Sequence, residues 1–257
     1  MKKEESLPYQ EAVARGNMYR FLSAVFLNPP SLSLLECIAD GGLLQELSGL
    51  FGQKAVAGLT ECADTTHPHE DMEFLKQEYM DLFAVPTGGY VFPFEDVYRG
   101  TAVDGKQERG PLLGERAISV IRAYREAGAE MDRTGKELPT HIGIELAFLS
   151  FLCEREASAL LEQEETKDIE STRYHHLQMR FLRQHVNQWF PQLHRSIQKN
   201  AKSQFYRGLA LITEAFLAQD TANLTAKFHS KRRTSQKRDG RNGRAKYLEC
   251  GTQCRAE

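Results

Sequence analysis

The sequence of 257 residues lacks a long uninterrupted apolar run, which argues against a protein that spans a membrane. A transmembrane helix needs about 20 predominantly apolar residues. The most apolar stretch, residues 142–152, covers only about half that length. The first residues, MKKEESLPYQ, also lack the apolar core of a signal peptide. We therefore expect a cytoplasmic protein without stable membrane insertion.

Cysteine is scarce and forms no disulfide framework, which fits a reducing compartment. The five cysteines are Cys37, Cys62, Cys153, Cys250 and Cys254. Cys250 and Cys254 make a single C-x₃-C, a weak indication of zinc because a structural zinc site takes four ligands. His67 and His69 flank a proline and have no third ligand nearby in the sequence, so we expect solvated loop residues there. We expect neither a metal nor a cofactor.

Strand-like alternation, internal repeats and a glycine-rich phosphate loop are also missing. Instead, apolar residues recur at intervals of three and four, which predicts amphipathic helices. The helix expected over residues 172–190 should stop at Pro191. The predicted fold class is all-α, a single multi-helix bundle domain. Its clearest helices are expected at residues 11–27, 70–83, 111–128, 172–190 and 203–217, besides the central helix described below.

The last part of the chain differs in composition from the rest. Residues 227–257 carry ten Lys/Arg against three Asp/Glu, whereas residues 1–226 have a net charge of −9. With few large apolar side chains, this segment cannot bury enough surface to fold alone. We therefore expect a helical domain over residues 1–226 and a disordered basic tail over 227–257. The acidic body favours a cationic partner over nucleic acid.

The stretch ELPTHIGIELAFLSFLCERE at residues 137–156 predicts the central helix of the bundle. Pro139 marks where a helix can begin, and Thr140 is expected to be its N-cap. His141 and Glu145 lie four residues apart and hence on one face at the mouth of this helix. Two interpretations follow: a polar recognition spot at the rim of the core, or a histidine hydrogen-bonded to the glutamate of its own helix.

Residues 84–100, AVPTGGYVFPFEDVYRG, form the longest irregular stretch of the body. It holds two prolines, two adjacent glycines and four aromatic residues. A long loop inside a compact protein is usually functional. Either this segment binds a partner, or it is a strap that covers an apolar surface.

Together these segments resemble the TorD/DmsD/NarJ-type chaperones of molybdenum-containing oxidoreductases, the redox enzyme maturation proteins. The resemblance covers most of residues 9–220, and its five segments occur in the family's order. The matching segments are YRFLSAVFLNPP (19–30), EYMDLF with VFPFEDVY (78–83 and 91–98), ELPTHIGIELAFL (137–149), RFLRQHVNQWFP (180–191) and FYRGLA (205–210).

Two departures from the family pattern stand out. Thr140 replaces the aspartate that usually precedes the signature histidine, and Asp96 replaces the usual serine of the aromatic loop. The loop's usual Pro-Pro is Phe92-Pro93 here. Loss of the aspartate removes a charge from the expected binding spot and puts in doubt any role of that residue, including weak nucleotide binding.

The resemblance implies a chaperone and not an enzyme. Its partner would be the apo catalytic subunit of a molybdenum or tungsten oxidoreductase, bound through a twin-arginine leader or N-terminal segment until molybdopterin is inserted. An apolar groove would hold the middle of that peptide, and acidic groups would hold its arginines. The expected client-binding residues are Tyr79, Leu82, Phe83, Tyr90, Phe92, Pro93, Phe94, Glu95, Asp96, Tyr98, Glu137, Pro139, His141 and Glu145.

Two other functions remain open at this point. The first is a helical metal-dependent hydrolase, although the HExxH and Glu-x-x-His spacings are missing. Its ligands would come from His141, Glu145, His175, His176 and His185. The second is a tail that binds RNA or an acidic membrane, although aromatic residues are rare in it. For the oligomeric state, the sequence allows either a monomer or a domain-exchanged dimer.

Overall fold

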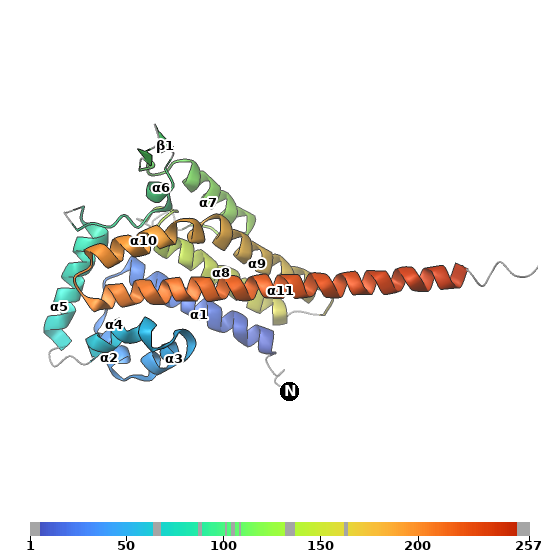
Figure 1. The fold of residues 1–257 in the computed structure, drawn as a ribbon, viewed down its shortest axis with the longest axis horizontal. Helices are drawn as coiled ribbons and strands as arrows, with labels where there is room; N and C mark the ends of the chain where they lie inside the picture. Colours follow the sequence, from blue (N-terminus) through green and yellow to red (C-terminus); the bar gives the residue numbers. More distant parts are fainter. Residues whose placement is uncertain are drawn as a thin grey trace, which may run out of the picture. The chain divides into compact units, whose positions relative to one another are not determined.

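The computed structural model describes residues 6–63, 68–86, 89–100, 102–103, 106–107, 109–131, 137–161 and 164–250. These residues are almost entirely helical, apart from loops and one pair of two-residue antiparallel strands, β1 (Ala102–Val103) and β2 (Lys106–Gln107) (Figure 1). The predicted all-α fold class is thereby confirmed. The helices are α1 (Leu7–Leu27), α2 (Leu32–Ala39), α3 (Gly42–Phe51), α4 (Gln53–Ala63), α5 (Pro68–Tyr79), η1 (Met80–Ala84), α6 (Glu95–Tyr98), α7 (Glu115–Glu126), α8 (Ile142–Leu161), α9 (Glu164–Gln184), α10 (Val186–Asn200) and α11 (Gln204–Cys250).

The chain divides into two compact units, residues 1–218 and residues 219–257. The expected end of the last helix at Leu217 is wrong, because α11 runs on to Cys250. No proline or glycine occurs between residues 218 and 239, so nothing in the local sequence ends the helix there. The inability of residues 227–257 to fold alone stays a prediction. Cys254 and His67 lie outside the described residues.

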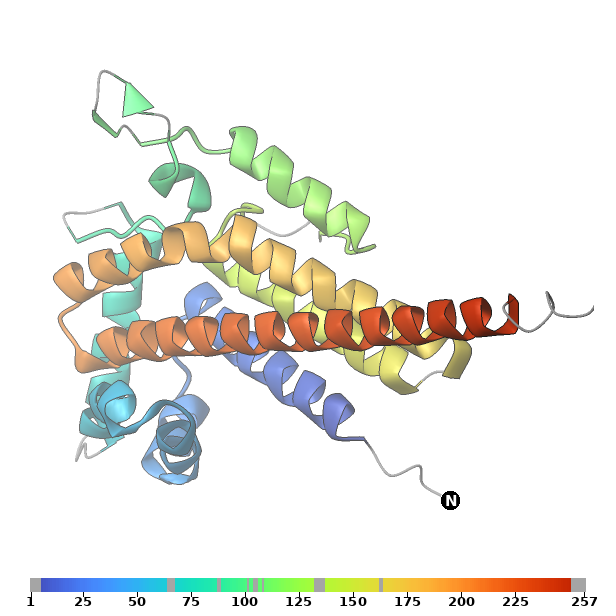
Figure 2. The same ribbon diagram turned by 45° about the vertical axis from the view of Figure 1, so that its right-hand side comes forward.

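Helix α8 is the centre of the first unit, as its composition predicts. It packs along α1 on one side and α9 on another (Figure 2). Its residues Ile142, Leu146, Leu149 and Leu152 are fully buried. Close contact with α1 depends on Gly16, where an added Cβ would lie 3.2 Å from Cβ of Cys153. An apolar helix enclosed in this way gains its stability chiefly from packing.

The irregular stretch after α5 begins with a single π-helical turn, η1, which buries Leu82 and Phe83. The backbone N–H of Val91 donates to the carbonyl of Leu82 over 2.7 Å. This bond returns the chain to the bundle after the turn. The segment we call the strap, residues 91–98, then crosses the start of α8 and ends in the short helix α6.

The helix expected to end at Pro191 instead breaks at His185. His185 has φ −121° and ψ −93°, which separates α9 from α10, and Pro191 lies inside α10. The expectation was wrong because a tertiary contact fixes the break: Nδ1 of His185 lies 2.8 Å from Oε2 of Glu95 in the strap. Inside α10, Pro191 lacks one backbone N–H donor and crowds the carbonyl one turn earlier, and the packing of the helix offsets the free energy that this costs.

Candidate functional site: the strap, the turn into the central helix and an adjoining pocket

The strap and the turn that enters α8 (residues 137–145) are joined directly. The N–H of Ile142 donates to the carbonyl of Pro93 over 2.8 Å, and the N–H of Glu95 donates to the carbonyl of Thr140 over 2.9 Å. The rings of Phe94 and His141 meet edge to face, with centroids 5.3 Å apart. Two segments that are far apart in the sequence therefore form one structure.

Thr140 does not cap α8. Its hydroxyl donates to Oδ2 of buried Asp96 over 2.8 Å, while the N–H of Gly143 donates to Nδ1 of His141 over 3.0 Å. The imidazole thus performs the capping expected of the threonine. Burial lowers the pKa of His141 to about 4, so the ring is neutral at pH 7 and carries its proton on Nε2. Oε2 of Glu137 lies 3.8 Å from that nitrogen.

Three of the carboxyl groups expected to meet a peptide's arginines point inward. Glu95, Asp96 and Glu145 are each at most 3% exposed. Glu95 pairs with Arg99 and with His185, and these contacts lower its pKa although burial opposes them. In this structure the three groups hold the strap, α8 and the α9–α10 break together and are not presented at the surface.

Glu145 is the most unusual of these carboxyl groups. Its Oε2 accepts the indole N–H of Trp189 over 3.0 Å, and its Oε1 has no hydrogen-bond partner among the described residues. Burial, and secondly the charge of Glu95, raise the pKa of Glu145 well above its usual value. Glu145 therefore holds its proton more tightly than an exposed glutamate does, and it lies beside Glu95, whose pKa is lowered. The expected hydrogen bond between His141 and Glu145 side chains is not formed, because Nδ1 of His141 faces Gly143.

The predicted groove residues divide into a buried and a partly exposed group. Leu82 and Phe83 belong to the core, and the hydroxyl of Tyr79 donates to the carbonyl of Phe26 over 3.1 Å. Pro93 is also buried, and Tyr98 stacks on Trp189 with ring centroids 5.6 Å apart. Partly exposed aromatic surface remains on Tyr90, Phe92 and Phe94. Tyr90 and Phe92 meet at 4.8 Å, and the guanidinium of Arg109 lies 4.5 Å above Phe92.

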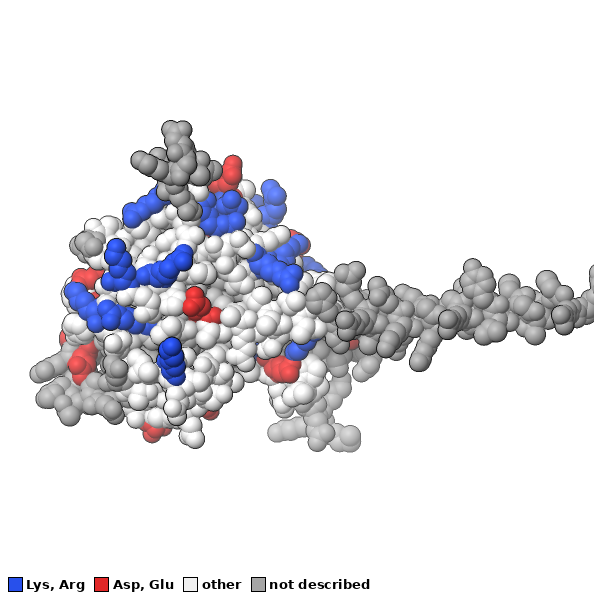
Figure 3. All heavy atoms as spheres, in the orientation of Figure 1, with Lys and Arg blue, Asp and Glu red and all other residues white. Residues whose placement is uncertain are grey.

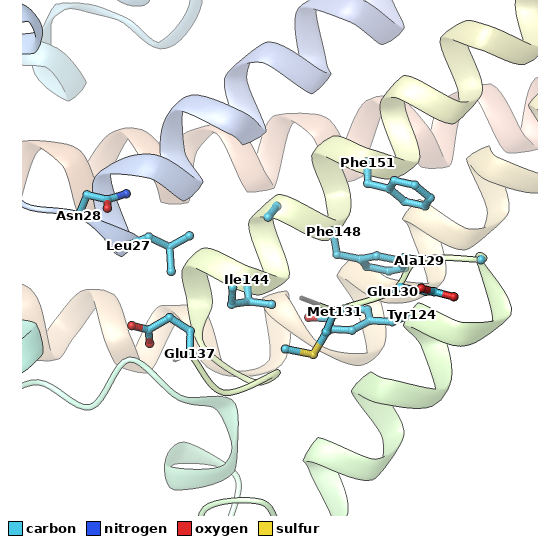
Figure 4. A pocket seen from close by; sticks show the side chains of 12 residues that line it. Leu27, Asn28, Tyr124, Ala129, Glu130, Met131, Glu137, Ile144, Phe148 and Phe151 are labelled. Carbon is cyan, nitrogen blue, oxygen red and sulfur yellow. The ribbon is translucent and has the colours of Figure 1, made fainter. Parts of the chain in front are cut away.

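A pocket of about 660 Å³ adjoins the turn, and the sequence analysis did not predict it. It lies between the end of α1, the end of α7 and the first turns of α8 (Figure 4). Most of its lining is apolar, and the acids Glu130 and Glu137 stand at its edge. The lining residues are Leu27, Asn28, Tyr124, Gly128, Ala129, Glu130, Met131, Glu137, Ile144, Ala147, Phe148 and Phe151.

Glu137 is the one predicted site residue that lines this pocket. Burial, and secondly the charge of Glu137, raise the pKa values of Tyr79 and Tyr90. Glu137 is therefore within electrostatic reach of these two aromatic residues as well. A sequence signal for the pocket did exist. The helix from residue 142 is apolar nearly all round, and α1 and α9 together leave part of this surface, at Ile144, Ala147 and Phe151, only partly covered.

The histidines proposed as metal ligands belong to separate networks. His175 lies 3.8 Å from Glu156, whereas His185 contacts Glu95 and His141 contacts Gly143. Within the described part of the chain, no three His, Cys, Asp or Glu side chains are grouped so that they could hold a metal ion. The same residues include no helix with the length and apolarity needed to cross a bilayer.

Comparison with known proteins identifies the family of the chain. Residues 52–195 match the family model described as nitrate reductase delta subunit, and this range contains the strap, the turn, α7 and α8. The chain is also 26% identical over 210 residues to the perchlorate reductase assembly chaperone protein of Dechloromonas aromatica (strain RCB), which covers 80% of this chain and 88% of that protein. The chain therefore belongs to the nitrate reductase delta subunit family, the NarJ/TorD-type group of redox enzyme maturation proteins.

Proposed function

We propose that this protein is a cytoplasmic assembly chaperone for a molybdenum- or tungsten-containing oxidoreductase. It binds the twin-arginine leader or N-terminal segment of the apo catalytic subunit and holds the subunit until its cofactor has been inserted. Family membership and the relative that is an assembly chaperone support this role. The observation that carries the choice of site is the apolar pocket with two acids at its edge.

The chemistry of the pocket fits a peptide that is apolar in the middle and cationic at one end. Its volume of about 660 Å³ can take a few large side chains but no folded domain. Glu130 and Glu137 at the edge of the pocket support pairing with the arginines of the same peptide, because guanidinium–carboxylate pairs are strong and directional. The buried acids Glu95, Asp96 and Glu145 then act indirectly, by fixing the turn and the strap beside the pocket.

Binding of this kind is expected to be reversible. A leader peptide is disordered when free, and ordering it costs roughly 2–5 kcal/mol of the gross interaction energy. The moderate affinity that results suits a protein that must release its client. We infer no need for a nucleic-acid partner or for catalysis in this role.

Isothermal titration with a synthetic leader of the client tests the site. Ala147→Phe fills the pocket with a ring and should weaken peptide binding about tenfold or more. Ser158→Phe places the same ring on an exposed position of α8 away from the pocket and serves as the matched control. Peptide binding that is equally strong in the wild type and Ala147→Phe would remove the pocket from the proposal.

The acidic edge needs a separate comparison. Glu137→Gln and Glu130→Gln should each weaken binding of a twin-arginine peptide but leave binding of a twin-glutamine version nearly unchanged. Glu36→Gln, at an exposed position on α2, controls for the loss of one negative charge. If the twin-glutamine peptide binds wild type as well as the arginine peptide does, the acids have no role in recognition.

The family match favours this role over a helical metal-dependent hydrolase based on His141, Glu145, His175 and His176. Metal analysis of purified protein distinguishes the two. A stoichiometric transition metal that is lost in His141→Ala would support the hydrolase and contradict the chaperone role proposed for this turn.

A further inference from the structure

Charge is divided unevenly along the first unit of the chain. Residues 1–170 contain sixteen Lys/Arg against thirty Asp/Glu, a net charge of −14. Residues 171–213 contain seven Lys/Arg and no Asp or Glu. This acid-free stretch covers the second part of α9, all of α10 and the first turns of α11. A strongly basic segment therefore occurs in a body that is otherwise acidic.

Four of these cations lie around the corner where α10 turns into α11. Arg195 and Lys199 are exposed one helical turn apart on α10, and Lys202 is exposed in the connection. Arg207, in the first turn of α11, donates to the carbonyl of Ala201 over 2.6 Å. We call Arg195, Lys199, Lys202 and Arg207 the basic corner. Figure 3 shows lysine and arginine side chains gathered over α10 and the start of α11.

Two acids reach this corner: Asp81, and the buried Glu78, whose Oε1 accepts the backbone N–H of Lys202. The side chain of Lys202 pairs with Asp81 at 3.2 Å, so its charge is partly offset. Within the described part of the chain, Arg195 and Lys199 meet no acidic side chain at ion-pair distance. The nearest acid in the sequence, Glu214, is paired with His194 at 2.8 Å. The corner thus keeps a positive potential that can attract an acidic surface.

The surroundings indicate what kind of acidic surface fits. Nucleic-acid binding without base readout uses exposed aromatic rings for stacking. In residues 171–213 every tyrosine, tryptophan and phenylalanine is buried, namely Tyr174, Phe181, Trp189, Phe190, Phe205 and Tyr206. A membrane-surface helix needs an apolar face to insert. Leu211, at 37% exposed, is the single large apolar side chain exposed in this described stretch. A charged helical surface without exposed aromatic rings or an apolar face suits the acidic surface of a folded protein.

We propose that the basic corner is a second docking surface, which holds an acidic patch on the folded body of the client. This inference rests on the proposed function, in which the client's N-terminal segment occupies the pocket. The corner shares no residue with the pocket. Two weak contacts to one polypeptide raise the overall affinity because the second contact is intramolecular. Either contact can then open without loss of the client.

The test compares two ligands on the full chaperone chain carrying Arg195→Glu and Lys199→Glu. The first ligand is the synthetic N-terminal peptide of the client, and the second is the full-length apo catalytic subunit of the same client. The double variant should bind the peptide within about twofold of wild type but bind the full-length subunit at least about tenfold more weakly at low salt. Wild-type affinity for the full-length subunit should fall with added salt, and that of the variant should fall less.

A charge-matched control carries Lys54→Glu and Arg122→Glu, two exposed cations outside the corner. It should bind both ligands as wild type does. Arg195→Gln with Lys199→Gln should give an intermediate loss and guards against misfolding caused by charge reversal.

The outcomes separate this inference from the proposed function. Unchanged binding of the full-length subunit by the charge-reversal variant overturns the second docking surface, whether or not the peptide binds. Equal losses for peptide and subunit overturn it too, because the corner would then belong to the peptide site. Lost binding to single-stranded RNA or anionic vesicles, with client binding intact, assigns the corner to another partner and overturns it as well. Failure of the peptide to bind wild type contradicts the proposed function instead.

Discussion

The hydroxyl of Thr140 donates a 2.8 Å hydrogen bond to Oδ2 of Asp96, and both side chains are buried. In the pattern that this chain resembles, a carboxylate stands at the position of Thr140 and a hydroxyl at that of Asp96. The two departures from the pattern are therefore one transposition. Donor and acceptor have exchanged places, and the negative charge moves from the turn before α8 to α6 in the strap. The expectation that the binding spot loses a charge stays a prediction.

The transposition predicts strong coupling between the two positions. Thr140→Asp places a second carboxylate beside that of Asp96. Asp96→Ser removes the carboxylate that accepts from the Thr140 hydroxyl and, over 3.3 Å, from the N–H of Ala117. Each single change should lower the free energy of unfolding by about 1.5–3 kcal/mol. The double variant should recover at least about 1 kcal/mol of the summed loss, as measured by urea denaturation. Strictly additive losses would contradict direct coupling.

His141 predicts a loss of stability in mild acid. Its pKa is about 4 in the folded protein because of burial, whereas the ordinary value is 6.5. The unfolded chain therefore binds a proton more readily, and stability falls as pH drops from about 6.5 towards 4. The full effect is roughly 3 kcal/mol. Urea denaturation between pH 7 and 4.5 measures it.

His141→Asn is the control for this effect, because the asparagine oxygen can still accept from Gly143 but does not titrate. The variant should show a flatter dependence in that window. An identical pH dependence in both proteins would mean that other groups cause the loss.

Glu145 makes the stability of the folded protein depend on pH in the opposite direction. Burial, followed by the charge of Glu95, raises its pKa in the folded protein well above the ordinary 4.5. The stability that this proton contributes is fully present below pH 4.5 and is lost as pH rises through the folded pKa. Glu145→Gln removes this loss and still accepts from Trp189, so it should stabilise the protein at pH 7 by at least about 1 kcal/mol.

The single tryptophan, Trp189, is fully buried and provides the fluorescence signal for unfolding. The gain from Glu145→Gln should shrink as the pH approaches 4.5. A variant that is less stable than wild type at every pH would show that Glu145 is ionised in the native state or needed for packing.

Glu78 links α5 to the corner between α10 and α11. Its Oε1 accepts the N–H groups of Lys202 and Ser203, the latter over 2.9 Å, and its side chain is buried. Glu78→Ala leaves two partly buried backbone donors without their acceptor and should cost about 1–3 kcal/mol in thermal or urea unfolding. Glu78→Gln keeps one acceptor oxygen and should cost less. Equal costs would show that only the volume of the side chain matters.

Local patterns were sufficient for the main features of the fold. The apolar run after Pro139 predicted the central helix. The helix breaks were less predictable. Pro191 is a strong local signal, yet the break occurs at His185 because of its contact with Glu95, a residue 90 positions away. No local pattern contains that contact.

The candidate site was predicted only in part for a similar reason. Composition alone cannot tell an acid on the surface from one that pairs in the core, and Glu95 and Glu145 proved to be of the second kind. The pocket next to Glu137 depends on how α1, α7 and α8 diverge. That arrangement follows from packing between distant segments and not from the sequence of any one of them.

The break at His185 makes the strap and the last helices of the bundle dependent on each other. His185 ends α9 and also contacts Glu95 in α6. A ligand that moved α6 away from the bundle would break this contact and loosen the bend between α9 and α10. Amide deuterium uptake at the start of α10 would then rise, although that helix touches no ligand in the pocket. Exchange at this bend would therefore report whether the strap is bound to the bundle or displaced from it.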